Sequence, residues 1–261
     1  MSIPLTPSFL LAVAALVAVA GAVNGVAGFG FAVVGTMALA TAVDPATAVV
    51  FMILPIVAVN LSLVSELSTA DVRSCGRRFA PLLAAATVGT ILGMLLLDRL
   101  PEASLRLTLG VITLGFVAAT QRLVPLPDLT AGLDPDRLSS PTAMVLVGSV
   151  SGLLFGATNV GVQLVAYVRS FDLSHGLFVG VVAIVFLGIN AVRVAAAGAF
   201  GLYADTTIAL LSLAAMIPAA AGVAVGSRLR PRLSERLRRG VVLGLLTGIG
   251  VRLSLGGLGI A

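Results

Sequence analysis

The sequence predicts an all-α integral membrane protein with two inverted repeats of about five hydrophobic segments each, and with broken or re-entrant helices at the repeat interface. Hydrophobic residues make up 59% of the 261 residues, charged residues make up 10%, and the mean hydropathy is +1.14. A soluble domain of this length cannot bury so much apolar surface, so we expect lipid to be the solvent. Glycine and polar residues also recur at matched spacing in the two halves, which indicates a duplication.

Ten apolar segments follow one another along the chain. They cover residues 8–23, 27–43, 46–65, 79–97, 105–123, 141–156, 159–171, 176–197, 206–227 and 240–259. A helix of about 20 apolar residues crosses the hydrocarbon core, whereas one of 10–14 residues does not. We therefore expect full spans at 46–65, 79–97, 105–123, 176–197, 206–227 and 240–259. The stretches 8–43 and 141–171 each hold two shorter runs, which predicts either tilted spans or helices that break and turn back.

The repeat is visible in the spacing of small and polar residues. These residues pair across the halves as Gly21 with Gly148, Gly25 with Gly152, Asn60 with Asn190, Gly89 with Gly222 and Gly93 with Gly226. Small residues four apart let helix backbones approach closely in lipid, and Gly244 and Gly248 have the same spacing. We expect Asn60 and Asn190 to occupy pseudo-symmetric positions close to the centre of the molecule.

The expected domains follow from this duplication. Residues 1–123 form the first membrane repeat, residues 124–140 a cytoplasmic linker rich in Pro and Asp, and residues 141–261 the second, inverted repeat. Five segments per half is an odd number, so the second copy enters the membrane from the opposite face. Inverted repeats of this kind place a substrate site at their interface, lined by broken helices.

Polar groups at the two breaks are the first candidate binding residues. The run from Gly25 to Gly30 is denser in glycine than helix packing requires. Unwound backbone and helix N-termini there would favour an anion, although a simple tight turn is the alternative. The candidates for substrate contact in this break are Asn24, Gly28, Phe29 and Gly30.

The second-half break carries Thr158, Asn159 and Gln163. Asn159 and Gln163 are four residues apart, which predicts one helix face. Unpaired amides in hydrocarbon cost several kcal/mol, so these side chains need partners. Hydrogen bonds between helices and contact with a substrate are the two interpretations.

Arg193 is a charge inside an expected full span, and Asn190 lies three residues earlier on the same face. Burying an arginine costs about 2.5–3.5 kcal/mol on insertion scales, so such residues often have a function. A guanidinium beside an amide can bind an oxyanion with a planar pair of donors. Snorkelling of the side chain to the interface is the alternative.

The scarcity of His, Cys, Asp and Glu in the expected spans argues against several function classes. The chain has one His, one Cys and no Asp or Glu in the middle of any expected span. An enzyme site needs a cluster of such groups in one cavity, and acid-gated cation antiporters need a membrane carboxylate. We expect no catalytic residue, no metal, no cofactor and no nucleic-acid partner. The expected partners are the lipid bilayer and a small anionic substrate; a homo-oligomer and a structural subunit of a larger assembly stay open.

Three stretches together resemble the TauE/SafE sulfite exporter family. They are residues 24–31 (NGVAGFGF), the corresponding stretch of the second half from Gly152 to Tyr167, and residues 186–193 (FLGINAVR) followed by Gly198 and Gly201. The resemblance covers nearly the whole chain. It implies a multi-pass transporter of small sulfur-containing anions, of the sulfite, sulfonate or sulfoacetate type, in the bacterial inner membrane.

One departure from the family pattern bears on the substrate. Residues 157–161 are Ala-Thr-Asn-Val-Gly, where many members of the family carry paired glycines or Gly-Pro. A transporter of another small anion such as a carboxylate, or a channel-like facilitator, is therefore the alternative function. The direction of transport and the coupling ion do not follow from the sequence.

Arginine placement predicts the orientation in the membrane. Six of the 16 arginines lie between Arg228 and Arg239, on the side that also holds most of the other loop arginines. The positive-inside rule makes this side cytoplasmic and places both termini outside. A reporter that is active only in the cytoplasm should stay inactive when fused after Ala261 and be active when inserted in the 228–239 loop. Activity of the fusion after Ala261 would refute this orientation.

Overall fold

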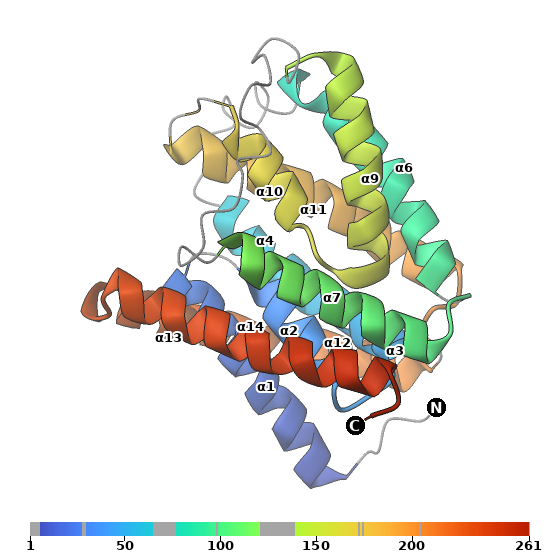
Figure 1. The fold of residues 1–261 in the computed structure, drawn as a ribbon, viewed down its shortest axis with the longest axis vertical. Helices are drawn as coiled ribbons and strands as arrows, with labels where there is room; N and C mark the ends of the chain where they lie inside the picture. The colour runs from blue at the N-terminus through green and yellow to red at the C-terminus, as the bar shows by residue number, and fades with distance from the viewer. Residues whose placement is uncertain are drawn as a thin grey trace. The chain divides into compact units, whose positions relative to one another are not determined.

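The protein is described from a computed structural model, which describes residues 6–27, 30–64, 77–97, 99–120, 139–171, 173, 175–203 and 205–260. Helices are the regular secondary structure throughout these residues, which confirms the all-α class (Figure 1). The elements are α1 (Pro7–Ala27), α2 (Phe31–Ala40), α3 (Pro45–Phe51), α4 (Ile53–Val64), α6 (Ala80–Leu97), α7 (Glu102–Thr120), α9 (Pro141–Thr158), α10 (Val162–Arg169), α11 (His175–Ala199), α12 (Thr206–Ala214), α13 (Met216–Leu229), the 3₁₀ helix η1 (Arg230–Arg232) and α14 (Glu235–Gly257).

Within the described ranges, five helices are long and apolar enough to cross a membrane. They are α1, α6, α9, the continuous run Thr206–Arg232, and α14. The chain is therefore an all-helical, multi-pass membrane protein. The expected segments 27–43 and 159–171 hold only α2, with 10 residues, and α10, with 8 residues. The stretches 8–43 and 141–171 therefore each hold one helix long enough to cross a membrane, α1 or α9, and one short helix. That the short helices turn back in the membrane stays a prediction.

Two expected spans are interrupted. In 46–65, α3 ends at Phe51 and α4 begins at Ile53, and in 206–227, α12 ends at Ala214 and α13 begins at Met216. Proline explains both turns, because Pro55 and Pro218 have no N–H to donate to the carbonyl four residues earlier. The Ser212 hydroxyl donates instead to the released Phe51 carbonyl. Despite its turn, the run Thr206–Arg232 is long and apolar enough to cross a membrane, which agrees with the span expected at 206–227, whereas Pro45–Leu61 is a shorter apolar helix.

The chain divides into two compact units, and each unit takes helices from both halves of the sequence. Unit 1 consists of Met1–Val59, Asp98–Gln121 and Ala197–Ala261, and unit 2 consists of Asn60–Leu97 and Arg122–Ala196. Apart from residues 139 and 140, the expected linker 124–140 lies outside the described residues. The division into two sequence repeats stays a prediction.

In unit 2, α6 and α9 lie side by side with their backbones in contact (Figure 1). A Cβ atom added at Gly89 would collide with the Ser149 carbonyl oxygen, and one at Gly93 with that of Leu153. From the other side, a Cβ at Gly152 would collide with the Ala86 carbonyl. This confirms the close packing predicted for Gly89 and Gly93.

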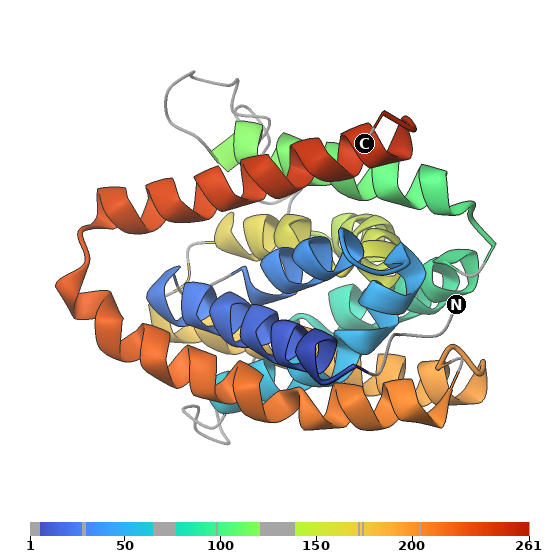
Figure 2. The same cartoon turned by 90° about the horizontal axis from the view of Figure 1, so that it is seen from below.

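In unit 1, α1 and α13 cross in the same way (Figure 2). A Cβ at Gly222 would collide with the Ala18 carbonyl oxygen, and one at Gly226 with that of Ala22. Gly25 of α1 in turn faces the Val223 carbonyl. The packing role predicted for Gly222 and Gly226 is therefore also confirmed.

The two crossings share one register, which differs from the pairing drawn from the sequence. In each crossing a glycine packs against a backbone carbonyl of the facing helix. Two of these carbonyls, that of Ala18 in α1 and that of Ser149 in α9, are 131 residues apart in the sequence. If the halves are repeats, this spacing pairs Gly21 with Gly152 and Gly25 with Gly156, in place of the pairs Gly21–Gly148 and Gly25–Gly152 drawn from the sequence. The difference is four residues, because a motif with a period of four matches itself equally well after a shift of one helical turn.

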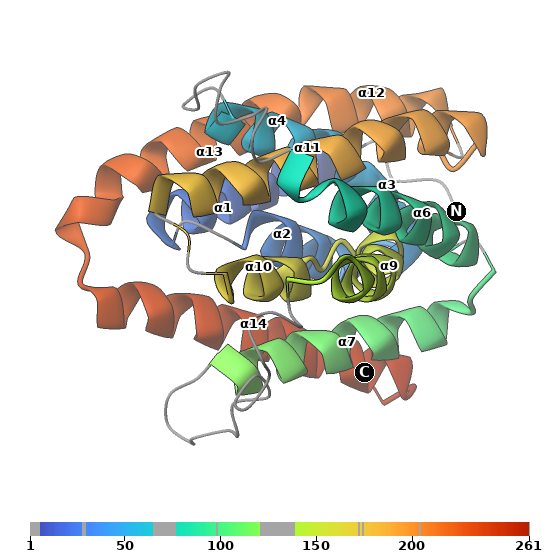
Figure 3. The same cartoon turned by 90° about the horizontal axis from the view of Figure 1, so that it is seen from above.

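Gly244 and Gly248 do not pack as predicted. Added Cβ atoms at these positions would meet nothing within 4 Å among the described residues. α14 instead packs on α7 (Figure 3), where a Cβ at Gly257 would collide with the backbone of Leu107. The contact between α14 and α7 therefore uses a different glycine of the same helix.

These contacts predict opposite outcomes for two glycine substitutions. Gly152→Ala pushes the methyl group into the Ala86 backbone and should destabilise the protein by about 1–3 kcal/mol, the range for overpacking. Gly244→Ala adds the same methyl group in open space and should leave stability unchanged or slightly raise it. The unfolding temperature of the purified variants in detergent measures both. An equal effect of the two substitutions would contradict the close crossing.

Candidate functional site

The break between α9 and α10 in unit 2 is held by its own side chains. Asn159 follows α9 in the left-handed region, with φ of 61°, the one non-glycine residue with positive φ among those described. The Thr158 hydroxyl donates to the Leu154 carbonyl over 2.6 Å, and its oxygen accepts from the Val160 N–H over 3.2 Å. These bonds fix the direction in which the chain leaves α9.

Gln163 also bonds to the break. Its Nε2 donates to the Val160 carbonyl over 3.1 Å. The predicted common helix face of Asn159 and Gln163 was wrong, since Asn159 ends α9 and Gln163 lies in α10. The left-handed conformation of Asn159, with φ of 61°, ends α9, and α10 begins only at Val162. Thr158 and Asn159 are fully buried, so the break lies inside the protein.

Arg193 of α11 is the largest fully buried side chain among the described residues, with 0% of its surface exposed. Its Nη1 donates to Asn190 Oδ1 over 3.3 Å, and Asn190 Nδ2 donates to the Phe186 carbonyl over 2.8 Å. The guanidinium carbon lies 4.8 Å from the centre of the Phe155 ring, within range of a cation–π interaction. The snorkelling interpretation was therefore wrong, because the charged end lies inside the protein.

Two phenylalanines join Arg193 to the break. Phe155 lies in the last turn of α9, and its ring centre is 5.2 Å from that of Phe186 in α11. A Cβ at Gly161 would collide with the Phe186 ring, so the break packs directly against α11. We call the following set the Arg193 cluster: Phe155, Thr158, Asn159, Gly161, Phe186, Asn190 and Arg193.

The cluster is a buried cationic centre within one compact unit. A charged hydrogen-bond donor in a low-dielectric environment interacts with an anion far more strongly than it does in water. The planar guanidinium matches the oxygen spacing of an oxyanion. Sequence reasoning identified Thr158, Asn159, Asn190 and Arg193, but it missed Phe155 and Phe186. The available signal was the spacing of Phe155 from Asn159 and of Phe186 from Asn190, four residues in each case.

The first-half break lies in unit 1. Asn24 is buried, and its Oδ1 accepts from the Phe31 N–H over 3.2 Å, so the side chain caps the start of α2. Gly30 precedes α2 with φ of 102°, a conformation that favours glycine. Gly28 and Phe29 lie outside the described residues.

Arginines hold the ends of helices in unit 1, a role that sequence reasoning did not assign. Arg106 donates to the Ala40 carbonyl over 3.1 Å and forms an ion pair with Glu102. Arg238 donates to the Val26 carbonyl near the end of α1 over 3.3 Å. Both guanidiniums satisfy carbonyls that a helix leaves open at its C-terminus.

Asn60, the remaining candidate, lies near the end of α4 with its side chain half-buried. Its pseudo-symmetry with Asn190 stays a prediction.

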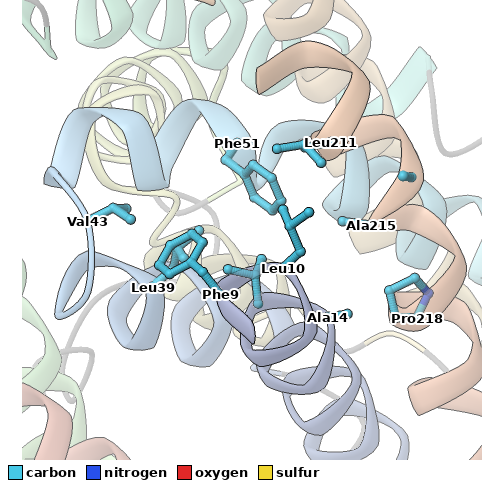
Figure 4. Close-up of a pocket in the computed structure, with 11 residues that line it drawn as sticks. Phe9, Leu10, Ala14, Leu39, Val43, Phe51, Leu211, Ala215 and Pro218 are labelled. Atoms are coloured by element: carbon cyan, nitrogen blue, oxygen red, sulfur yellow. The ribbon is translucent and has the colours of Figure 1, made fainter. Parts of the chain in front are cut away.

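An apolar cavity of about 220 Å³ lies in unit 1 (Figure 4). Its walls come from α1, the ends of α2 and α3, and the junction of α12 and α13. They consist of Phe9, Leu10, Val13, Ala14, Leu39, Val43, Phe51, Leu211, Ala214, Ala215 and Pro218. These side chains offer no polar group to an anion, so this cavity is not the candidate anion site.

At position 159, the left-handed backbone predicts that a glycine variant is more stable than an alanine variant. Asn159→Ala and Asn159→Gly both remove the amide, but alanine is strained at φ of 61° whereas glycine is not. We expect the alanine variant to be less stable than the glycine variant by about 1 kcal/mol. Thermal unfolding of the two purified variants tests this, and an alanine variant as stable as the glycine variant would contradict the turn.

Comparison with known proteins places nearly the whole chain in one family. The sequence model of the family described as Sulfite exporter TauE/SafE matches residues 13–253. No curated protein and no solved structure matches the chain.

Proposed function

The chain belongs to the sulfite exporter TauE/SafE family, and on this premise we propose that it transports a small sulfur-containing anion, such as sulfite, a sulfonate or sulfoacetate, across the bacterial inner membrane. The single observation that carries the proposal is the full burial of Arg193 in a membrane protein. The insertion cost of about 2.5–3.5 kcal/mol makes such a charge expensive as a packing residue alone.

The surroundings of Arg193 support an oxyanion as the ligand. Asn190 holds one arm of the guanidinium, and the Phe155 ring lies against its carbon. A side chain restrained in this way loses less conformational entropy when it binds a ligand. A planar pair of donors matches the oxygens of sulfite or a sulfonate, and Thr158, Asn159 and Gln163 add polar groups at the adjacent break.

The two helix crossings support an internal duplication. α1 meets α13, and α9 meets α6, through glycines and carbonyls in one register. We propose that the halves 1–123 and 141–261 are inverted repeats, since an odd number of segments per half reverses the direction of the second copy. In this proposal Asn24, Gly28, Phe29, Gly30 and Asn60 form the first-half counterpart of the substrate-binding break.

Substitution of Arg193 should weaken anion binding without unfolding the protein. We expect Arg193→Gln to lose about 1.5–3 kcal/mol of sulfite binding, the range for a hydrogen bond to a charged group. This is about a tenfold to hundredfold weaker affinity. Arg193→Lys should recover only part of the loss, because an ammonium makes no planar bidentate contact. Calorimetric titration of the purified variants with sulfite measures the affinities.

Arg252 supplies the matched control for this experiment. It lies in the candidate span α14 but is exposed, so Arg252→Gln removes the same charge from a residue outside the cluster and should leave sulfite binding unchanged. A folded Arg193→Gln variant that binds sulfite as tightly as the parent would refute the assignment of Arg193.

The substrate class is tested by transport. Vesicles that contain only the purified chain and lipid should take up labelled sulfite, and an excess of unlabelled sulfonate should compete with it. Preferential uptake of labelled acetate would instead support a carboxylate transporter. If the chain transports neither anion, a role as a subunit of a larger assembly becomes the better interpretation.

A further inference from the structure

Six of the 16 arginines lie at the junction between α13 and α14, and the proposed transport function does not use them. The junction consists of the end of α13, the 3₁₀ helix η1 with Pro231, and the first turn of α14 (Figure 2). Arg228, Arg230, Arg232 and Arg236 are exposed there, and we call these four residues the arginine patch.

The patch is presented by an ordered turn. Pro231 restricts the backbone within η1, and the Ser234 oxygen accepts from the Leu237 N–H over 3.3 Å to cap α14. Within the described residues, the ion pair of the structure is that of Arg106 with Glu102, and none includes a patch arginine. Glu235 is the one acidic residue between Arg228 and Arg239. Four like charges on a short turn repel one another unless an anion binds.

The position of the patch limits the source of that anion. The run Thr206–Arg232 and α14 are both long and apolar enough to cross a membrane, and the patch lies where they meet. The two ends of adjacent spans lie at the membrane surface, where headgroup phosphates are concentrated. Arginine is the side chain best suited to bind phosphate oxygens in pairs.

An apolar surface continues from the patch along α14. Leu237, Val241 and Leu245 are spaced by four residues, so they share one face of the helix, and all three are exposed. Such a face suits the acyl chains of a lipid whose headgroup binds the arginines. A free phosphate ion would make no use of it.

From these observations we propose that the arginine patch binds the headgroup of an anionic phospholipid, with its acyl chains against the exposed face of α14. Arg238 does not belong to this site, because its guanidinium donates to the half-buried Val26 carbonyl of α1. The proposal is independent of the transported substrate and would stand if another anion were carried.

Lipid binding to the intact protein tests the proposal. The purified full chain in detergent is titrated with phosphatidylglycerol or phosphatidylcholine, and bound lipid is counted by native mass spectrometry. We expect at least tenfold tighter binding of phosphatidylglycerol, and a decrease when the salt concentration rises. Equal binding of the two lipids would overturn the proposal, and this comparison needs no variant.

Two matched variants locate the lipid. Gln substitution of all four patch arginines should weaken phosphatidylglycerol binding at least tenfold, whereas Lys substitution of the same four keeps the charge that directs insertion and should retain most of it. The control removes the same number of charges elsewhere, at the exposed Arg77, Arg78, Arg99 and Arg252, and should retain binding.

Three outcomes would contradict the assignment. The first is an equal loss in the control, which would indicate a response to net charge alone. The second is full binding in the Gln variant. The third is displacement of the lipid by inorganic phosphate at millimolar concentration, which would indicate a site for free anions instead.

Discussion

Direct contact between helix backbones is the constraint on which the rest of the structure depends. In lipid, apolar side chains gain little by leaving the solvent, so helix association relies on close van der Waals packing. The glycines of α6 and α9, and those of α1 and α13, permit this approach because any Cβ would collide with a facing carbonyl. In unit 2, the break after Thr158 follows directly from the end of α9, and it packs against Phe186 of α11.

The Arg193 cluster follows from that placement. α9 contributes Phe155 below the guanidinium, α11 contributes Asn190 beside it, and the break contributes buried polar groups. A charge within an apolar span is costly in lipid, and at Arg193 the protein encloses it. Enclosure strengthens any interaction with an anion, which connects the packing of the helices to the proposed transport of a sulfur oxyanion.

Many features of the fold and of the candidate site could be predicted from the sequence, and the features that were missed have physical causes. Composition and segment length predicted the membrane class and the helix breaks, because the bilayer imposes strict lengths. The interruptions at Met52 and Ala215 were missed, although Pro55 and Pro218 were visible signals. The glycine pairing drawn from the sequence differs by one helical turn from the spacing of the two crossings, since glycines spaced by four residues match in either register. Burial of Arg193 required three-dimensional contacts, because a position near the end of an apolar run is compatible with either burial or snorkelling.

The central claim is that the guanidinium of Arg193 binds the transported anion. The most direct measurement is the position of a heavier analogue, such as selenite, in an anomalous difference map of crystals soaked with it. The account predicts a selenium peak within about 4 Å of the Arg193 guanidinium, consistent with charged hydrogen bonds to the selenite oxygens. A well-occupied selenium site elsewhere in the protein, with none beside Arg193, would contradict it.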